Sequence, residues 1–220
     1  MNAESLPPGG RIEVWTEAGA GFPLVVSGPS GVGKTSLVDR LLALDRGTVR
    51  AITATTRPKR EGEIEGESYH FFSEERFLQL RDRGEVVESA RYNDAWYGTP
   101  RADLERNLAA GRCVVLNIEV QGAVQIRTRY PEAVLVFAIP PSWEALRDRL
   151  VRRGTDTPEA IEARIRRGRE EMEEIDRYDY VVVNDDLERC AGDLAAIVRA
   201  ERRRLDRIRG RRKSDGEDRR

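Results

Sequence analysis

One short stretch limits the fold of this chain more than any other. Residues 28–35 read Gly-Pro-Ser-Gly-Val-Gly-Lys-Thr and fit the pattern G-x-x-x-x-G-K-[ST]. They directly follow an apolar run, residues 22–26, and precede an amphipathic stretch, residues 35–44. A buried strand, a glycine-rich turn and a helix in this order form a phosphate-binding loop, because backbone N–H groups and the helix N-terminus point at an anion. The chain is therefore predicted to bind ATP or GTP.

The loop residues have separate predicted roles. Lys34 reaches the β and γ phosphates, and Thr35 offers its hydroxyl to a Mg²⁺ ion that bridges them. The glycines let the backbone turn around the anion without Cβ clashes. The predicted ATP-binding residues of the loop are Gly28, Pro29, Ser30, Gly31, Val32, Gly33, Lys34 and Thr35.

The composition indicates one folded unit, and its overall charge balance does not point to a nucleic-acid or membrane partner. The 220 residues are 39% hydrophobic, which suffices for one α/β domain with a sizeable core. Basic and acidic residues number 38 and 39, so neither nucleic acid nor a membrane is expected as a partner. No apolar run approaches membrane-spanning length, and the two cysteines, Cys113 and Cys190, read as reduced structural residues. We expect the protein to be cytoplasmic. The sequence is also compatible with a homodimer.

Short apolar runs alternate with amphipathic stretches, the pattern of βαβ units with a parallel sheet. Buried strands are predicted at residues 24–27, 113–119, 134–139 and 180–183. Ser142 starts a predicted helix that ends at Gly154. A second begins with Thr157-Pro158-Glu159, an N-cap followed by proline and an acidic residue, and runs to about residue 175.

A segment of different character separates the first helix from the run at Cys113. Residues 51–100 are polar, contain several aromatic side chains and have only short hydrophobic stretches, so they read as an insertion beside the sheet. Arginine forks, phenols and a carboxylate close together suggest a pocket for a phosphorylated, planar partner. The polar residues are Thr53, Thr55, Thr56, Arg57, Arg60, Tyr69, Glu88, Tyr97 and Thr99.

Over about residues 22–198 these and further motifs resemble the guanylate kinase family, whose members phosphorylate GMP. The motifs are Thr55-Thr56-Arg57-Pro58, Gly62-Glu63, Tyr97-Gly98-Thr99-Pro100, Gln121-Gly122, Pro140-Pro141-Ser142, Arg153-Gly154-Thr155 and Asn184-Asp185-Asp186. The resemblance implies a P-loop NTPase three-layer α/β fold with a parallel core sheet over residues 22–205. It also implies a GMP-binding insertion at about residues 51–100 and a lid at about residues 143–176.

The resemblance assigns most of the insertion's polar residues to a GMP site. Arg57 and Arg60 match the arginines that bind the GMP phosphate, and guanidinium forks suit a phosphate dianion. Tyr69 and Tyr97 match phenols that reach the same phosphate, although packing within the insertion would also explain them. Glu88 matches the guanine reader, since a carboxylate accepts from N1–H and the N2 amine of guanine, and adenine offers neither donor.

Three further residues complete the implied GMP set. Thr53 would bond to guanine O6, and Glu119 is the last residue of the strand predicted at residues 113–119. Thr99 has two readings, a ligand contact or the N-cap of a helix that begins with Pro100, and both can hold.

The lid arginines are implied by the resemblance alone. Arg149, Arg153 and Arg164 match residues that stabilise the migrating phosphoryl group. A charged helix face would explain them as well, because many neighbouring residues are arginines. Asn184 would contact the adenine of ATP, and a turn after a strand is the alternative.

The ends of the chain read as unstructured. The glycine- and proline-rich residues 1–21 are a predicted disordered extension. Nine Arg or Lys residues lie between Arg199 and Lys213, and a basic disordered tail is predicted at residues 206–220. A solvated helix end explains this charge, and an electrostatic anchor for a polyanion is the alternative.

The predicted reaction is ATP plus GMP to ADP plus GDP with Mg²⁺, in the salvage and recycling of guanine nucleotides. Two other functions are compatible with this fold: a binding module that keeps the fold without catalysis, and a kinase for a phosphorylated ribose. Intact Lys34 and Thr35 argue against the first, and Glu88 with Thr53 argues against the second. Function depends on the site, so the fold does not separate them.

One departure from the family pattern generates a test. The family usually carries Asp-x-Asp before Gln-Gly, where this chain has Asn117 and Glu119. A carboxylate after a buried strand commonly holds metal-bound water or substrate. We expect Glu119→Ala to lower kcat at least about tenfold, about 1.4 kcal/mol of barrier, in steady-state assays at saturating substrates. An unchanged kcat would show that neither position carries the chemistry.

Overall fold

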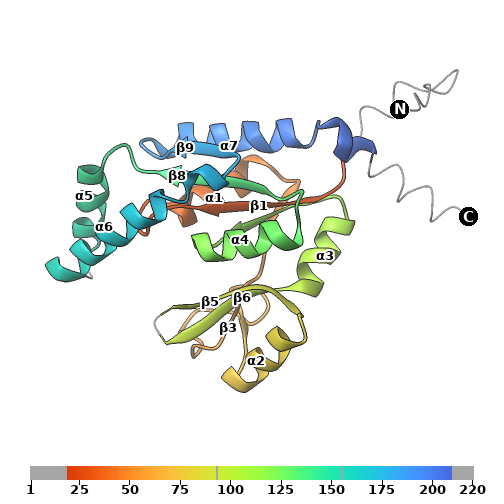
Figure 1. Cartoon of the computed structure of the whole chain (residues 1–220), viewed down its shortest axis with the longest axis horizontal. Coiled ribbons are helices and arrows are strands. Elements are labelled where there is room, and N and C mark those ends of the chain that lie inside the picture. Colours follow the sequence, from red (N-terminus) through yellow and green to blue (C-terminus); the bar gives the residue numbers. More distant parts are fainter. Residues whose placement is uncertain (1–18, 93, 155, 210–220) are drawn as a thin grey trace, which may run out of the picture.

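A computed structural model describes residues 19–92, 94–154 and 156–209. Its centre is a five-stranded sheet in the order β2-β7-β1-β8-β9, with every neighbouring pair parallel (Figure 1). All four predicted strands are present. β8 and β9 match both predicted limits, β1 begins two residues earlier and β7 ends two residues earlier than predicted, and the short β2 was not predicted. β9 was predicted to be buried, but among its four residues only Val182 is buried, because β9 is an edge strand. The strands are β1 (Phe22–Ser27), β2 (Thr48–Arg50), β7 (Cys113–Asn117), β8 (Val134–Ile139) and β9 (Tyr180–Val183).

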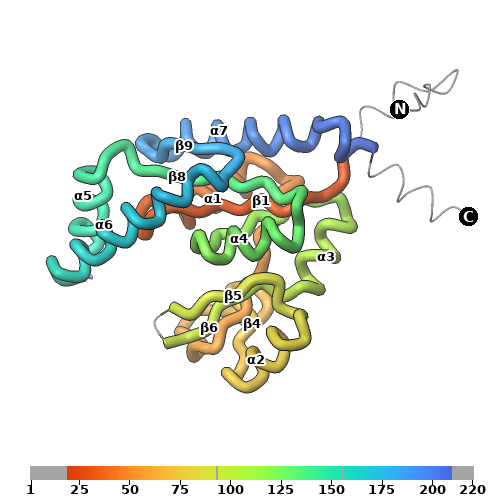
Figure 2. The backbone as a smooth tube through the Cα atoms, in the orientation of Figure 1, coloured from red at the N-terminus to blue at the C-terminus, as the bar shows by residue number. Residues whose placement is uncertain are grey.

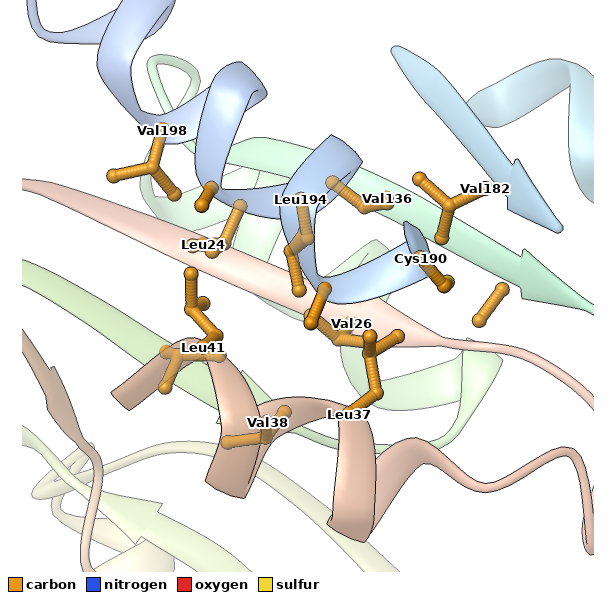
Figure 3. Close-up of a cluster of buried hydrophobic side chains, with 14 of the residues drawn as sticks. Leu24, Val26, Leu37, Val38, Leu41, Val136, Val182, Cys190, Leu194 and Val198 are labelled. Atoms are coloured by element: carbon orange, nitrogen blue, oxygen red, sulfur yellow. The ribbon is translucent and has the colours of Figure 1, made fainter. Parts of the chain in front are cut away.

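Helices cover both faces of this sheet. Leu24 and Val26 of β1 pack with α1 (Lys34–Leu44) and α7 (Leu187–Glu201), as Figure 3 shows for Leu37, Leu41, Leu194 and Val198. Val25, between them, packs on the other face with α3 (Arg101–Ala109) and α4 (Val120–Arg129). Successive strand residues point to opposite faces, so β1 is buried on both. The predicted three-layer α/β fold with a parallel core sheet is confirmed.

A second, smaller sheet lies beside the core and is built from residues of the 51–100 segment (Figure 2). Its strand order is β4-β3-β6-β5, and α2 packs on it through Phe77 and Leu80, which contact Ala54 and Val86. The elements are β3 (Ala54–Thr55), β4 (His70–Phe71), α2 (Glu74–Asp82), β5 (Val86–Tyr92) and β6 (Ala95–Pro100). Its small separate core makes this sheet a distinct body joined to the main core by α3 and α4.

Two helices project from one end of the core sheet, α5 (Trp143–Arg153) and α6 (Pro158–Met172) (Figure 1). The predicted caps are present: Ser142 accepts from Ala145 N at 3.1 Å, and Thr157 accepts from Ala160 N at 3.3 Å. Gly154 ends α5, as predicted. Helix α6 ends at Met172, short of the predicted residue 175, where the 3-10 turn η2 (Ile175–Arg177) begins.

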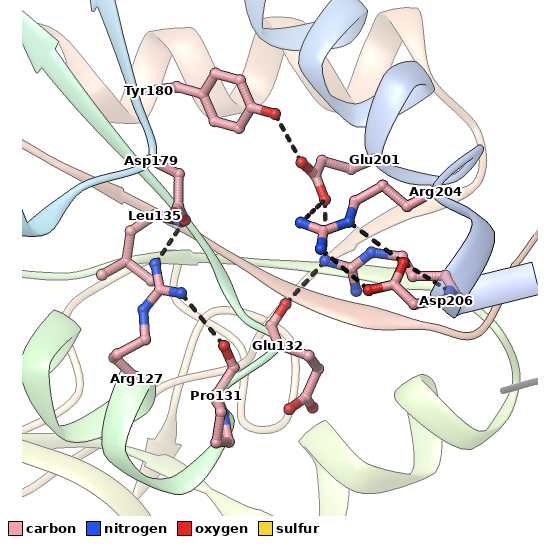
Figure 4. A network of polar contacts seen from close by, with 10 residues as sticks. Arg127, Pro131, Glu132, Leu135, Asp179, Tyr180, Glu201, Arg204 and Asp206 are labelled. Carbon is pink, nitrogen blue, oxygen red and sulfur yellow. Dashed lines mark hydrogen bonds and ion pairs between the residues drawn. The ribbon is translucent and has the colours of Figure 1, made fainter. Parts of the chain in front are cut away.

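The described C-terminal residues fold back onto the core. The Arg207 guanidinium lies 4.1 Å from the ring centroid of Phe22 in β1 and 3.1 Å from the Glu201 carboxylate. Tyr180 also donates to Glu201, at 2.7 Å, and Figure 4 shows this contact beside Arg204. Residues 206–209, which the sequence assigned to the tail, are therefore part of the folded domain.

The same holds for the last residues of the predicted N-terminal extension. Ala20 N donates to Arg207 O at 3.0 Å, so residues 19–21 join the C-terminal segment. Residues 1–18 and 210–220 of the two predicted terminal segments lie outside the described residues. Within the described part of the chain, no helix has the length and apolar character needed to cross a membrane.

We predict that Arg207→Ala lowers the free energy of unfolding by about 3 kcal/mol, because the 4%-exposed Glu201 loses its nearer cation and keeps Arg204 at 3.6 Å, and because Phe22 loses the cation that covers its ring. Urea unfolding followed by tryptophan fluorescence measures the change. Arg199→Ala, an exposed arginine on α7, is the control, with an expected change within about 0.5 kcal/mol. Equal unfolding midpoints for the two variants would contradict the prediction.

Candidate active site

The phosphate-binding loop connects β1 to α1, and its backbone presses against the sheet. Gly28 has φ 142°. A Cβ atom at this position would collide with the carbonyl oxygen of Ala138 in β8, so only glycine fits. Helix α1 begins at Lys34, directly after the loop. The free N–H groups of its first turn therefore face the space enclosed by the loop, as an anion site requires.

Lys34 folds back over this loop. Its Nζ donates to the Gly28 carbonyl at 2.5 Å and lies 4.0 Å from the Glu119 carboxylate. The side chain is 11% exposed, and this burial lowers the pKa of Lys34, an effect that Glu119 and Glu171 oppose. In a site poor in water the attraction between this ammonium and a phosphate is far stronger than in bulk solvent.

Thr35 and Asn117 meet at the start of α1. The Asn117 amide, at the end of β7, donates to Thr35 Oγ1 at 3.2 Å. Glu119 follows two residues later and occupies the N-cap position of α4, without a capping hydrogen bond from its side chain. Among the described residues no group of three or more His, Cys, Asp or Glu could hold a metal ion by itself. An ion here would rest on the Thr35 hydroxyl and on nucleotide oxygens, and the neighbouring amide and carboxylate suit a hard cation.

Two residues that were predicted to contact the nucleotide, Asn184 and Arg149, form hydrogen bonds with the backbone of the phosphate-binding loop. The Asn184 amide donates to Val32 O at 2.7 Å, and this residue is 5% exposed. Arg149 donates to the same carbonyl at 3.0 Å and to Asn184 O at 2.7 Å. In this structure the Asn184 amide thus bonds to the loop backbone, and Arg149 anchors α5 to the loop. Contact of Asn184 with the adenine of ATP stays a prediction.

The other two predicted lid arginines have different surroundings from Arg149. Arg164 on α6 is 3.4 Å from the Asp156 carboxylate. Arg153 is exposed at the last residue of α5. Arg149 bonds to the loop, Arg164 pairs with Asp156 and Arg153 is exposed, so the contacts of the three arginines differ in this structure.

A cavity of about 180 Å³ brings five of the predicted GMP-binding residues together. It opens between the small sheet and the C-terminal end of β7. Its lining residues are Thr53, Tyr69, Glu88, Ala90, Tyr92, Tyr97, Asn117, Ile118 and Glu119. Since Glu119 also approaches Lys34, this cavity and the phosphate-binding loop share one wall.

Glu88 is the buried carboxylate of this cavity. It is 4% exposed, and burial raises its pKa to about 7. The Thr99 hydroxyl donates to Glu88 Oε1 at 2.7 Å. Helix α3 begins at Arg101 with Pro100 at the N-cap position and no side-chain cap, so the reading of Thr99 as an N-cap is wrong. Thr99 is absent from the cavity wall and orients Glu88 from behind.

The predicted phosphate-binding residues are partly assembled. Arg57 donates to Glu63 Oε2 at 2.8 Å, and its guanidinium lies 5.0 Å from the ring centroid of Tyr69. Tyr69 packs edge-on against Tyr97, with centroids 6.2 Å apart. Arg57 lowers the pKa of Glu63 to about 2. Arg60 is exposed, and its backbone N–H also donates to Glu63. An incoming phosphate would therefore share Arg57 with Glu63.

Sequence reasoning missed Glu171 and Arg167 of α6. Glu171 is 8% exposed, and burial together with the Glu119 carboxylate raises its pKa to about 7. Arg167 donates to Glu171 at 3.1 Å and lies 3.9 Å from Glu119. The signal was the apolar stripe of α6, since residues 161, 165, 168 and 171 are the buried ones and follow helical spacing. A glutamate that continues the buried stripe of a helix is therefore expected to have a buried carboxylate.

Together these residues join two sites. A wider cavity of about 420 Å³ continues between β5 and α6, with Glu119, Gln121, Arg166 and Arg167 in its wall. A phosphate held by the loop and a planar phosphorylated molecule held near Glu88 would meet beside Glu119. The arrangement suits transfer of a phosphoryl group between two bound molecules.

Comparison with known proteins agrees with this geometry. The family model described as Guanylate kinase matches residues 21–201. The guanylate kinase of Parasynechococcus marenigrum is 50% identical over 174 residues, which cover 79% of this chain and 96% of that protein. That of Caldanaerobacter subterraneus subsp. tengcongensis is 41% identical, covering 85% and 91%. The crystal structure of guanylate kinase from Anaplasma phagocytophilum superposes with a TM-score of 0.70 at 35% identity, covering 86% and 90%.

The raised pKa of Glu88 predicts a pH dependence of stability. Because its folded pKa is about 7 and the ordinary value is 4.5, the native state binds this proton more tightly than the unfolded state. The contribution to stability is present below pH 4.5 and is lost as the pH rises through 7. Relative to Glu88→Gln, the wild type should lose about 3 kcal/mol of unfolding free energy across this window.

Urea unfolding at several pH values from 4.5 to 8 measures the difference between the two proteins. The exposed neighbour Glu85 supplies the matched control, since Glu85→Gln should follow the wild type at every pH. A constant difference between wild type and Glu88→Gln would show that Glu88 does not titrate in this window.

Proposed function

The chain belongs to the guanylate kinase family and is an enzyme that phosphorylates GMP, and from this premise we propose that ATP donates the γ-phosphoryl group, giving ADP and GDP. The observation that carries the proposal is the shared wall of the two sites. Glu119 lies 4.0 Å from Lys34 and lines the cavity that holds Glu88. A donor on the loop and an acceptor in the cavity would have their phosphates adjacent there.

The donor site is the phosphate-binding loop. Its backbone N–H groups and the N-terminus of α1 would hold the β and γ phosphates of ATP. The buried Lys34 would neutralise the negative charge that develops between these two phosphates during transfer. Lys34 would exchange the Gly28 carbonyl for phosphate oxygens. Thr35 would hold Mg²⁺, which when bound neutralises negative charge on the nucleotide phosphates.

The acceptor site is the cavity at Glu88. As a carboxylate, Glu88 would accept from N1–H and the N2 amine of guanine, and Thr53 lies in the same wall for O6. Adenine would leave the buried Glu88 without donors, and polar sites of this kind discriminate by about 10⁴ to 10⁵. Arg57, Tyr69 and Tyr97 would take the GMP phosphate, consistent with their contacts with one another.

Transfer would depend on position and charge rather than on a covalent intermediate. We propose that residues 51–100 act as the GMP-binding part and residues 143–176 as the lid. Closure would bring Arg153 and Arg164 toward the migrating group and exclude water, while Arg149 keeps the lid attached to the loop. From composition we further propose a cytoplasmic enzyme that recycles guanine nucleotides.

A coupled assay of ADP release with ATP and Mg²⁺ tests the proposal, with GMP, AMP, UMP and ribose bisphosphate as acceptors. Of these four acceptors, we expect only GMP to support turnover. Lys34→Ala should lower kcat by about 10² to 10³, the range for loss of one preorganised donor to a transition state. ATP binding without turnover on any acceptor would favour a binding module in which Asn117 has disabled the chemistry. Turnover with the ribose bisphosphate would favour the sugar kinase.

A further inference from the structure

The backbone of the strand that carries Glu88 is held by a side chain from another layer of the molecule. Strand β5 is an edge strand of the small sheet, so one side of its backbone lacks a neighbouring strand. Gln125 of α4 occupies that side. Its Oε1 accepts from Ser89 N at 3.0 Å, and its Nε2 donates to Ser89 O at 3.1 Å. One amide thus makes both hydrogen bonds that a strand partner would make to this residue.

The contact falls where β5 is irregular. The pairing register with β6 changes from Val86 opposite Pro100 to Ser89 opposite Gly98, so three steps along β5 correspond to two along β6. Such a bulge redirects a side chain and weakens the ladder around it. Glu88 lies within this bulge, one residue before the position that Gln125 holds.

The residues on either side explain why β5 needs this support. Val86 packs in the core of the small sheet, and Val87 packs in the main core with Ala123 and Ile126 of α4. Consecutive residues of β5 thus belong to two separate hydrophobic clusters. The orientation of Glu88 therefore depends on how the small sheet is placed against α4.

Helix α4 also shapes the space behind the carboxylate. A Cβ atom on Gly122 would lie 2.8 Å from Glu88 Oε2 and 3.1 Å from Ile118 Cδ1. Gly122 and Gln125 are three residues apart and lie on one helix face. This face leaves room for the Glu88 carboxylate and fixes the backbone beside it.

We propose that Gln125 is a positioning residue for guanine recognition, holding Ser89 so that the Glu88 carboxylate is aimed at the base before GMP arrives. Preorganisation of this kind improves affinity because binding does not have to order the group. The proposal rests on the proposed function. In this role Gln125 acts through Ser89 without touching GMP, and it is absent from the cavity wall.

Gln125→Met in the full-length protein tests the proposal, because methionine matches the length of glutamine without its hydrogen-bonding groups. Calorimetric titration with GMP should give a Kd at least about tenfold weaker than wild type, the effect of about 1.4 kcal/mol. In the coupled assay KM for GMP should rise about as much, with KM for ATP unchanged. Gln79→Met is the matched control, since the exposed Gln79 side chain on α2 donates to Glu75 of the same helix, and the substitution should leave all values unchanged.

A double-mutant cycle with Glu88→Gln separates positioning from general stabilisation. If Gln125 acts through Glu88, its substitution should change the Kd for GMP less than twofold once Glu88 is glutamine. Additive effects would overturn the proposal, as would a lower Tm with an unchanged Kd for GMP. Should the methionine variant not fold, Gln125→Glu keeps the acceptor for Ser89 N and is expected to weaken GMP binding in the same direction.

Binding and turnover assays with GMP on the wild-type protein test the proposed function separately from the role of Gln125. Turnover with GMP together with an unaffected Gln125→Met variant would leave the kinase standing and remove Gln125 from its specificity. A wild type that neither binds nor phosphorylates GMP would end both proposals.

Discussion

The parallel direction of the core strands is the constraint on which the rest of the structure depends. Parallel strands bring their C-terminal ends to one edge of the sheet, where ligands of open α/β sheets bind. The phosphate-binding loop follows β1, Asn117 and Glu119 follow or end β7, and Asn184 follows β9. The Ser27 hydroxyl donates to Ile118 O at 2.8 Å and joins two of these strand ends. Side chains far apart in the sequence thereby converge on one loop.

Charge at this edge is balanced before a substrate binds. Lys34 and Arg167 lie among Glu119 and Glu171, so the buried ammonium and carboxylates partly compensate for each other's desolvation. A phosphate that enters the loop would compete with these carboxylates for the two cations. Because Glu171 and Arg167 lie on α6, the competition would act on a helix of the proposed lid and would link nucleotide binding to its movement.

The local patterns of the chain determined a large part of the fold. The loop motif, four of the five core strands and the caps at Ser142 and Thr157 depend on neighbours within a few residues, and these were predicted from such patterns. The short β2 was missed because its three residues carry no periodic signal. The membership of Glu88, Tyr69, Tyr97 and Thr53 in one site was predicted through family resemblance, and their common cavity is consistent with it.

Only the tertiary structure decided what individual polar side chains touch. Thr99 followed by proline reads locally as a cap, but it bonds to Glu88, a residue on a different strand. Arg149 stands among many arginines and is distinguished by Val32, 117 positions away in sequence. Gln125 holds Ser89 across 36 positions. A local pattern records which residues can form an element and which face is buried, whereas these partners are set by the packing of separate elements, a property that no short stretch of sequence contains.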